Sequence, residues 1–278
     1  MLPNVDSRTV SGFGMEWHSF DQSALDNAEL QRSFQRYFSI FPWQSLPRSA
    51  KGFDLGCGSG RWAKCVSTRV GELNCIDASS QALDVARQNL KAFPHCSFHH
   101  ASAGHLPFPD RSMDFGYSLG VLHHVPDTGG SLRDCARILK PGAPFLVYLY
   151  YALENRPAWY RWLWLCSDWG RKTLSCLPFV LRKIFSEGIA LLVYWPLART
   201  ARILHRLGIL PSSFPLACYR TTGFYTMRTD ALDRFGTYLE KRFTRAEIQE
   251  MMEGAGFEDI LFSEYPPYWC AVARRSSE

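Results

Sequence analysis

Three glycines alternate with other residues in the segment DLGCGSGRWA, residues 54–63. The segment follows a short apolar run typical of a β-strand and precedes a stretch typical of a helix. Glycine lets a backbone turn tightly and approach a ligand because it has no Cβ, and a helix N-terminus directs N–H donors at that ligand. Gly56, Gly58 and Gly60 therefore predict a ligand-binding turn.

The spacing of these glycines disfavours a dinucleotide cofactor. A GxGxxG fingerprint that starts at Gly56 needs glycine at position 61, where the sequence has Arg61. Asp77 ends a second apolar run, ELNCID, 17 residues after Gly60. A doubly wound fold places a carboxylate there beside the ribose of its nucleotide, so Asp77 is predicted to accept both ribose hydroxyls. The alternative is that Asp77 only caps the helix that follows it.

Strand-like and helix-like stretches alternate along the middle of the chain. Helical stretches such as SSQALDVARQNLKAF separate the short apolar runs KGFDLG, ELNCID, CSFHHA, MDFGYSL and PFLVYLYY. This alternation predicts a parallel sheet with right-handed crossovers. A capped helix that begins near Thr244 and a last strand, YWCAVARR, are predicted near the end of the chain.

These segments occur in an order that resembles one enzyme family. DLGCGSG, Asp77, ASAGHLPFPDRSMD (101–114), LGVLHHVPD (119–127) and LKPGAPFLVYLY (139–150) resemble the class I, Rossmann-like S-adenosylmethionine-dependent methyltransferases of the UbiE/UbiG-like type. The resemblance covers roughly residues 50–151 and 240–275. It implies an α/β fold with a doubly wound, mostly parallel sheet of seven strands, an antiparallel last strand, and a helical insertion between strands 5 and 6.

The resemblance also implies the cofactor, S-adenosyl-L-methionine, and its product, S-adenosyl-L-homocysteine. Asp54 and the three glycines would surround the methionyl and ribose part, and Ala78 would lie against adenine. Ser102, Ala103 and Leu119 are further expected cofactor contacts. Many relatives have aspartate where this chain has Ser102, so the adenine amino group is expected to meet a hydroxyl or a backbone carbonyl.

His123 and His124 follow the fourth predicted strand, at the carboxyl edge of the sheet. Methyl transfer needs mainly a positioned acceptor in a dry pocket, with a base only where the acceptor arrives protonated. A neutral imidazole accepts such a proton near pH 7, so one of the pair is a candidate catalytic base. The alternative is a structural or cofactor-packing role.

Four segments are expected along the chain. They are an N-terminal helical lid (1–50), a cofactor-binding core (51–151), a mostly helical insertion that covers the substrate (152–240), and a C-terminal completion of the sheet (241–278).

Four residues are candidates for substrate contacts. Trp17 is expected to cover the cofactor or to pack in the core. Tyr151 and Tyr225 are predicted to contact the substrate, and Arg228 either clamps an anionic group of the substrate or forms an ordinary salt bridge. No metal site is predicted.

The net charge of +5 is concentrated in the insertion. Nine basic residues lie between Arg156 and Arg206, against only Asp168 and Glu187. Five tryptophans, at 159, 162, 164, 169 and 195, are interleaved with them. Two interpretations are open: a peripheral surface for an anionic membrane or a lipid-linked substrate, or a helical cap with a small aromatic core and solvated arginines. The longest apolar run, 188–198, is too short to span a membrane.

The composition is that of an ordinary globular protein, with 46% hydrophobic and 21% charged residues. Nine unpatterned cysteines and the lack of a signal-like N-terminus predict a cytoplasmic protein. The expected acceptor is a small or amphiphilic metabolite, methylated on oxygen or nitrogen. One alternative is a nucleic-acid methyltransferase, which is unlike this chain in having an (N/D)PPY turn after the fourth strand. Another is an inactive cofactor-binding scaffold, which the intact Asp54, Asp77 and glycines disfavour.

Overall fold

The computed structural model describes residues 2–277. The chain forms two compact units. Unit 1 comprises Met1–Ser23, Leu30–Ala152 and Leu239–Glu278, and unit 2 comprises Ala24–Glu29 and Leu153–Tyr238.

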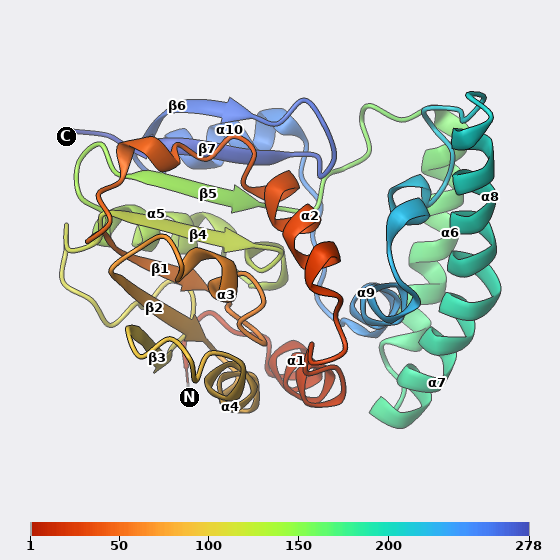
Figure 1. The fold of residues 1–278 in the computed structure, drawn as a ribbon, viewed down its shortest axis with the longest axis horizontal. Helices are drawn as coiled ribbons and strands as arrows, with labels where there is room; N and C mark the ends of the chain where they lie inside the picture. Colours follow the sequence, from red (N-terminus) through yellow and green to blue (C-terminus); the bar gives the residue numbers. More distant parts are fainter. Residues whose placement is uncertain (1, 278) are drawn as a thin grey trace. The chain divides into compact units, whose positions relative to one another are not determined.

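Unit 1 is built on one seven-stranded sheet of order β3-β2-β1-β4-β5-β7-β6 (Figure 1). Strands β1 to β4 pair in parallel with their neighbours, as do β4 and β5, whereas β7 is antiparallel to both β5 and β6. The predicted fold class is therefore confirmed. The strands are β1 (Lys51–Leu55), β2 (Glu72–Asp77), β3 (Cys96–His100), β4 (Phe115–Leu119), β5 (Pro144–Tyr148), β6 (Phe257–Phe262) and β7 (Cys270–Arg275).

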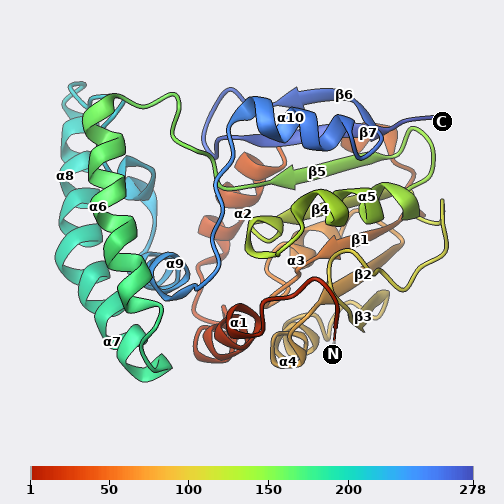
Figure 2. The ribbon, with the colours of Figure 1, turned by 180° about the vertical axis from the view of Figure 1, so that it is seen from behind.

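Helices cover both faces of this sheet. Helices α2 (Asn27–Tyr37) and α3 (Ala63–Val66) lie on the face seen in Figure 1, and α5 (Thr128–Ile138) and α10 (Arg245–Glu253) lie on the face seen in Figure 2. Helix α1 (Ser7–Ser19) packs against α4 (Ser80–Asn89). Helix α10 begins after Thr244, whose side chain forms a capping box with Glu247, as the sequence predicted.

Burial on both faces explains why the strands read as continuous apolar runs. Every residue of β4 is buried. On one face the rings of Phe145 and Phe53 lie 6.0 Å apart, and those of Phe145 and Phe257 lie 5.1 Å apart. On the other face Tyr117 packs edge-on against Phe38, which follows α2. The packed sheet holds the carboxyl ends of β1, β2 and β4 at one edge.

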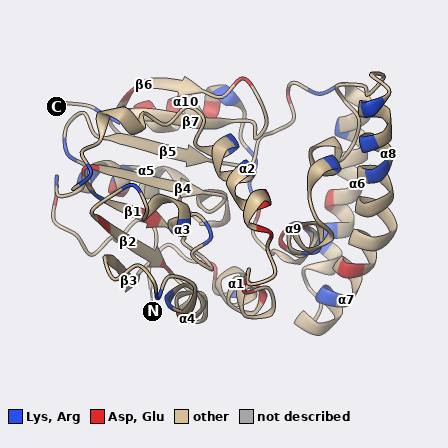
Figure 3. Cartoon of the chain, in the orientation of Figure 1, with Lys and Arg blue, Asp and Glu red and all other residues tan. Residues whose placement is uncertain are grey.

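Unit 2 is helical. Its helices are α6 (Ala158–Leu174), α7 (Phe179–Ile189), α8 (Trp195–Arg206) and α9 (Phe224–Gly236), with a π-helical segment, Ala190–Tyr194, that joins α7 to α8. Basic residues are frequent on α8 (Figure 3). The buried apolar cluster of this unit is small and consists of Ala190, Tyr194, Ala198, Met227, Ala231 and Phe235.

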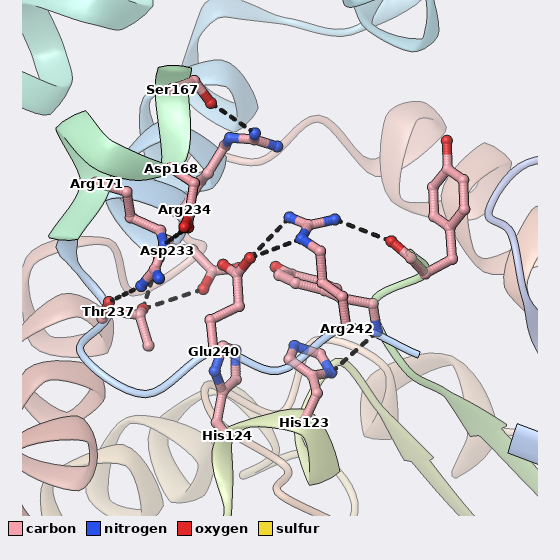
Figure 4. Close-up of polar contacts among 12 residues, drawn as sticks. His123, His124, Ser167, Asp168, Arg171, Asp233, Arg234, Thr237, Glu240 and Arg242 are labelled. Atoms are coloured by element: carbon pink, nitrogen blue, oxygen red, sulfur yellow. Dashed lines mark hydrogen bonds and ion pairs between the residues drawn. The ribbon is translucent and has the colours of Figure 1, made fainter. Parts of the chain in front are cut away.

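Buried polar contacts hold unit 2 together. The Arg171 guanidinium on α6 forms an ion pair with Asp168 at 2.7 Å and donates to the Thr237 carbonyl at 3.0 Å (Figure 4). Glu29 accepts from the Gly223 N–H at 2.8 Å. Within residues 2–277, no helix has both the length and the apolar character needed to cross a membrane.

Candidate functional site

A pocket lies in unit 1 at the carboxyl ends of β1, β2 and β4. Its walls come from the glycine turn (55–62), the end of β2 (77–79), Ala101 and Ala103 after β3, and the segment after β4 (119–125). Residues between Val5 and Trp17, mostly from α1, complete it. Ligands of open α/β sheets bind at this edge, outside the carboxyl ends of the strands.

The glycine turn has a conformation that L side chains rarely adopt. The φ angles of Gly56, Gly58 and Gly60 are +76°, +54° and +76°. The Gly56 N–H donates to the Ile76 carbonyl at 2.7 Å, which fixes the turn against β2. A Cβ built on Gly58 would lie 2.9 Å from the Trp17 indole. This position therefore requires glycine both for its backbone angle and for the close approach of α1.

Asp77 links the turn to β2. Its Oδ2 accepts from the Gly58 N–H at 2.9 Å, and its Oδ1 accepts from the Ser79 N–H at 2.8 Å. Burial raises the pKa of Asp77 above its usual value, and the two N–H groups oppose that rise. A carboxylate offers about four acceptor positions, so two remain available to hydroxyl groups of a ligand. This donor and acceptor set fits the ribose of an adenosyl cofactor.

Six of the nine predicted cofactor residues line the pocket, namely Gly56, Gly58, Asp77, Ala78, Ala103 and Leu119. Asp54, Gly60 and Ser102 do not line it. Gly60 instead packs near Leu90, which would lie 2.9 Å from an added Cβ. Ser102 is fully buried between the two alanines that do line the wall.

Asp54 lies in β1, directly before the glycine turn. Its Cα is in register with Tyr117 on β4, and its side chain is buried. Burial raises the pKa of Asp54 to about 8, against an opposing contribution from the Tyr117 hydroxyl. Asp54 is therefore mostly protonated at neutral pH.

The two candidate histidines have different surroundings (Figure 4). His124 lines the pocket, and its Nδ1 lies 2.6 Å from the Leu239 carbonyl oxygen. Because a carbonyl only accepts, Nδ1 carries the proton and Nε2 is the basic nitrogen of the neutral ring. His123 is fully buried outside the pocket lining, and its Nδ1 accepts from the Tyr150 N–H at 3.3 Å. Burial lowers the pKa of His123 well below its usual value.

A segment that sequence reasoning missed, residues 239–243, orients these histidines. The Lys241 N–H donates to the His123 carbonyl at 3.0 Å, next to the contact of Leu239 with His124. Arg242 forms a buried ion pair with Glu240 at 2.8 Å and lies over the Tyr150 ring. No local motif marks this segment, because its role depends on the chain returning to the sheet after unit 2.

Helix α1 supplies a wall of the pocket that the sequence indicated only at Trp17. Thr9, Phe13 and Trp17 all line the pocket, and their spacing of four residues places them on one face of the helix. The Phe13 ring centroid lies 5.1 Å from that of His124. That spacing is the signal that could have identified Thr9 and Phe13. Arg61, which disfavoured a dinucleotide cofactor, also lines the pocket.

The other predicted substrate residues lie outside this pocket. Tyr151 pairs with Phe243 through a β-bridge, and its ring lies 5.7 Å from that of Tyr268. Tyr225 and Arg228 belong to α9 of unit 2. Arg228 forms an ion pair with Glu187 of α7, the salt-bridge alternative that the sequence left open.

The similarity to known proteins lies in the part of the chain that contains most of the pocket. Residues 53–147 match the family model described as a methyltransferase domain. A demethylmenaquinone methyltransferase of Bacillus licheniformis is 32% identical over 102 residues, which cover 35% of this chain and 44% of the relative. The enzyme of the same name from Staphylococcus aureus is 34% identical over 99 residues, which cover 34% of this chain and 41% of the relative. The chain thus matches less than half the length of these curated relatives.

Two solved structures resemble the fold over most of this chain. A Haloferax volcanii methyltransferase, solved in complex with the Trm112 methyltransferase activator, is 17% identical with a TM-score of 0.51, over 95% of this chain and 97% of that one. A Bordetella parapertussis protein is 16% identical with a TM-score of 0.51, over 91% of this chain and 71% of that one. Residues 53–147 therefore resemble a methyltransferase domain, and the sheet has the strand order and the antiparallel last strand of the Rossmann-like methyltransferase fold.

Proposed function

We propose that this chain transfers a methyl group from S-adenosylmethionine to a small or amphiphilic acceptor, on a hydroxyl oxygen or an amine nitrogen. The observation that carries the proposal is the contact between the Gly58 N–H and the Asp77 carboxylate on the wall of the pocket. This contact links two features of the pocket wall. One is a turn whose backbone a ligand can approach closely, and the other is an acidic group that accepts hydrogen bonds from hydroxyl groups.

The lining residues divide into groups that match the parts of the cofactor. Asp77 would accept from the ribose hydroxyls, and the apolar surfaces of Ala78 and Ala103 would contact adenine. The Arg61 guanidinium would pair with the methionyl carboxylate. When bound, the cofactor supplies an electrophilic methyl group on its sulfonium.

His124 would accept the proton of the methyl acceptor. Its Nδ1 donates to the Leu239 carbonyl, so its Nε2 provides the lone pair that a general base needs. His123, stacked on Tyr150 with ring centroids 3.8 Å apart, would position its neighbour. The names of the two curated relatives support a small-molecule acceptor, although their matched segments lie largely in the cofactor-binding part of the fold.

Asp77→Ala tests the cofactor site. Titration calorimetry with S-adenosylhomocysteine should show binding to the wild type and a loss of at least about tenfold in affinity for the variant, because the half-buried carboxylate makes charge-assisted hydrogen bonds. Asp84→Ala removes the same charge from an exposed position on α4 and should bind like the wild type. Equal affinities for all three proteins would overturn the assignment of Asp77.

The acceptor can be found with isotope-labelled S-adenosylmethionine in an extract of the protein's own host. Mass spectrometry should show a labelled small molecule that appears with the wild type and not with Asp77→Ala. Label in RNA or DNA would instead establish a nucleic-acid methyltransferase. Cofactor binding without any labelled product would establish an inactive scaffold.

A further inference from the structure

Exposed apolar side chains are concentrated in unit 2. Of the 18 large hydrophobic residues that are exposed among residues 2–277, 16 belong to this unit. Helix α6 exposes Trp159, Trp162 and Trp169, the last two with 69% and 76% of their surface accessible. Single exposed apolar residues are common on proteins, but gatherings of this extent mark surfaces that bind a partner or a membrane.

The spacing of these residues places them on one side of each helix. On α6 the exposed tryptophans lie opposite Asp168 and Arg171, which are buried. On α7 the exposed Val180, Ile184 and Phe185 lie opposite the buried Ser186. Because α6 and α7 both pack against α9, these two apolar faces point away from α9. We refer to the six exposed residues as the apolar face of unit 2.

Positive charge accompanies the apolar face. Helix α8 continues from α7 through the π-helical segment, and Arg202 and Arg206 on this helix are exposed. Between Arg156 and Arg206 nine basic residues stand against two acidic ones, Asp168 and Glu187, which form ion pairs with Arg171 and Arg228. Both acidic groups of this stretch are therefore engaged within unit 2, and the stretch has an excess of positive charge.

This combination points to one class of partner. Tryptophan beside aliphatic residues suits the boundary between lipid headgroups and acyl chains, and arginine suits lipid phosphates. A nucleic acid would leave Val180 and Ile184 without a favourable contact. A second copy of the chain would bring two basic surfaces together, and like charges oppose such an interface.

We propose that unit 2 docks on an anionic lipid bilayer, with its apolar face in the headgroup boundary and the α8 arginines on lipid phosphates. The helices lie on the bilayer and do not cross it. Docking of this kind needs no bound cofactor, so it is measurable independently of methyl transfer.

Vesicle co-sedimentation of the full chain tests this proposal. Vesicles of phosphatidylcholine with 30% phosphatidylglycerol should bind the wild type, and vesicles of phosphatidylcholine alone should bind it much less. Trp162→Ser with Trp169→Ser should weaken binding to the anionic vesicles at least about tenfold. Arg202→Gln with Arg206→Gln should weaken it about twenty-fivefold at low salt, since each arginine near an anionic surface contributes about fivefold in affinity.

Matched substitutions in unit 1 serve as controls. Leu261→Ser with Tyr265→Ser removes apolar residues that are 55% and 78% exposed, and Lys64→Gln with Lys91→Gln removes two exposed positive charges. Both control pairs should bind vesicles like the wild type, and all variants should melt within a few degrees of it. The proposal is overturned if the wild type does not bind anionic vesicles, or if the control and the test double variants lose binding equally. A dimer that Trp162→Ser with Trp169→Ser dissociates, without vesicle binding by the wild type, would also overturn it.

Discussion

At the scale of single residues, the two adjacent histidines differ in which nitrogen holds the proton. His124 donates from Nδ1 to Leu239 and lines the pocket, whereas His123 accepts at Nδ1 from the Tyr150 N–H outside the lining. The sequence identified both as candidate bases and did not distinguish them. The choice depends on backbone groups at 150 and 239, which are far away in the chain.

We expect His124→Ala to lower kcat by about 10² to 10⁴-fold while the affinity for S-adenosylhomocysteine changes little, because a lost base affects proton transfer. His123→Phe keeps a ring that can stack on Tyr150 and should retain turnover within about threefold. Steady-state kinetics and calorimetry measure both effects. Full turnover by the His124 variant would show that no base acts there.

The raised pKa of Asp54 predicts that the stability of the fold depends on pH. Its pKa in the folded state is about 8 because it is buried, against an ordinary value of 3.8. Between these values the folded state holds a proton that the unfolded state releases, so the contribution to stability is present at low pH and is lost as pH rises through 8. From pH 6.5 to 8 the free energy of unfolding should fall by about 2 kcal/mol through this group alone.

Asp54→Asn should remove that share of the pH dependence. Thermal melting from pH 6.5 to 8 should show a flatter profile for the variant than for the wild type. This range avoids His123, whose lowered pKa costs stability only as pH falls below about 6.5. Parallel profiles for the two proteins would contradict the raised pKa of Asp54.

At the scale of elements, the glycine turn and α1 pack closely against each other at Gly58 and Trp17. The turn was predictable because three glycines at fixed spacing leave few other structures, and the strands were predictable because burial on both faces makes them apolar throughout. The position of α1 was not predictable beyond Trp17. Its pocket-lining face is recognisable by spacing only once the helix is known to pack beside the turn.

Gly58→Ala tests this contact between α1 and the turn. It should lower the free energy of unfolding by about 1 to 2 kcal/mol for the left-handed backbone and by about 1 to 3 kcal/mol more for the clash with Trp17. Gly142→Ala has a similar φ of +75° and open space around the added Cβ, so it should show only the first cost. In a Trp17→Ala background the cost of Gly58→Ala should fall to that of Gly142→Ala. An unchanged cost would show that the indole does not rest on the turn.

At the scale of the whole molecule, the pocket and the basic aromatic surface belong to different units. All residues that line the pocket lie in unit 1, and the apolar face lies in unit 2. The charge pattern of the sequence located the basic region but left two interpretations of its tryptophans open. Composition does not reveal which side of a helix is buried, and in the structure Trp159, Trp162 and Trp169 are exposed rather than part of the small core of unit 2.

We propose that the pocket of unit 1 binds S-adenosylmethionine. Hydrogen–deuterium exchange of the full chain, with and without saturating S-adenosylhomocysteine, tests it most directly. We predict slower exchange in the pocket segments 5–17, 55–62, 77–79, 101–103 and 119–125. Exchange that is unchanged in those segments at a saturating concentration, or that slows only elsewhere, would contradict the account.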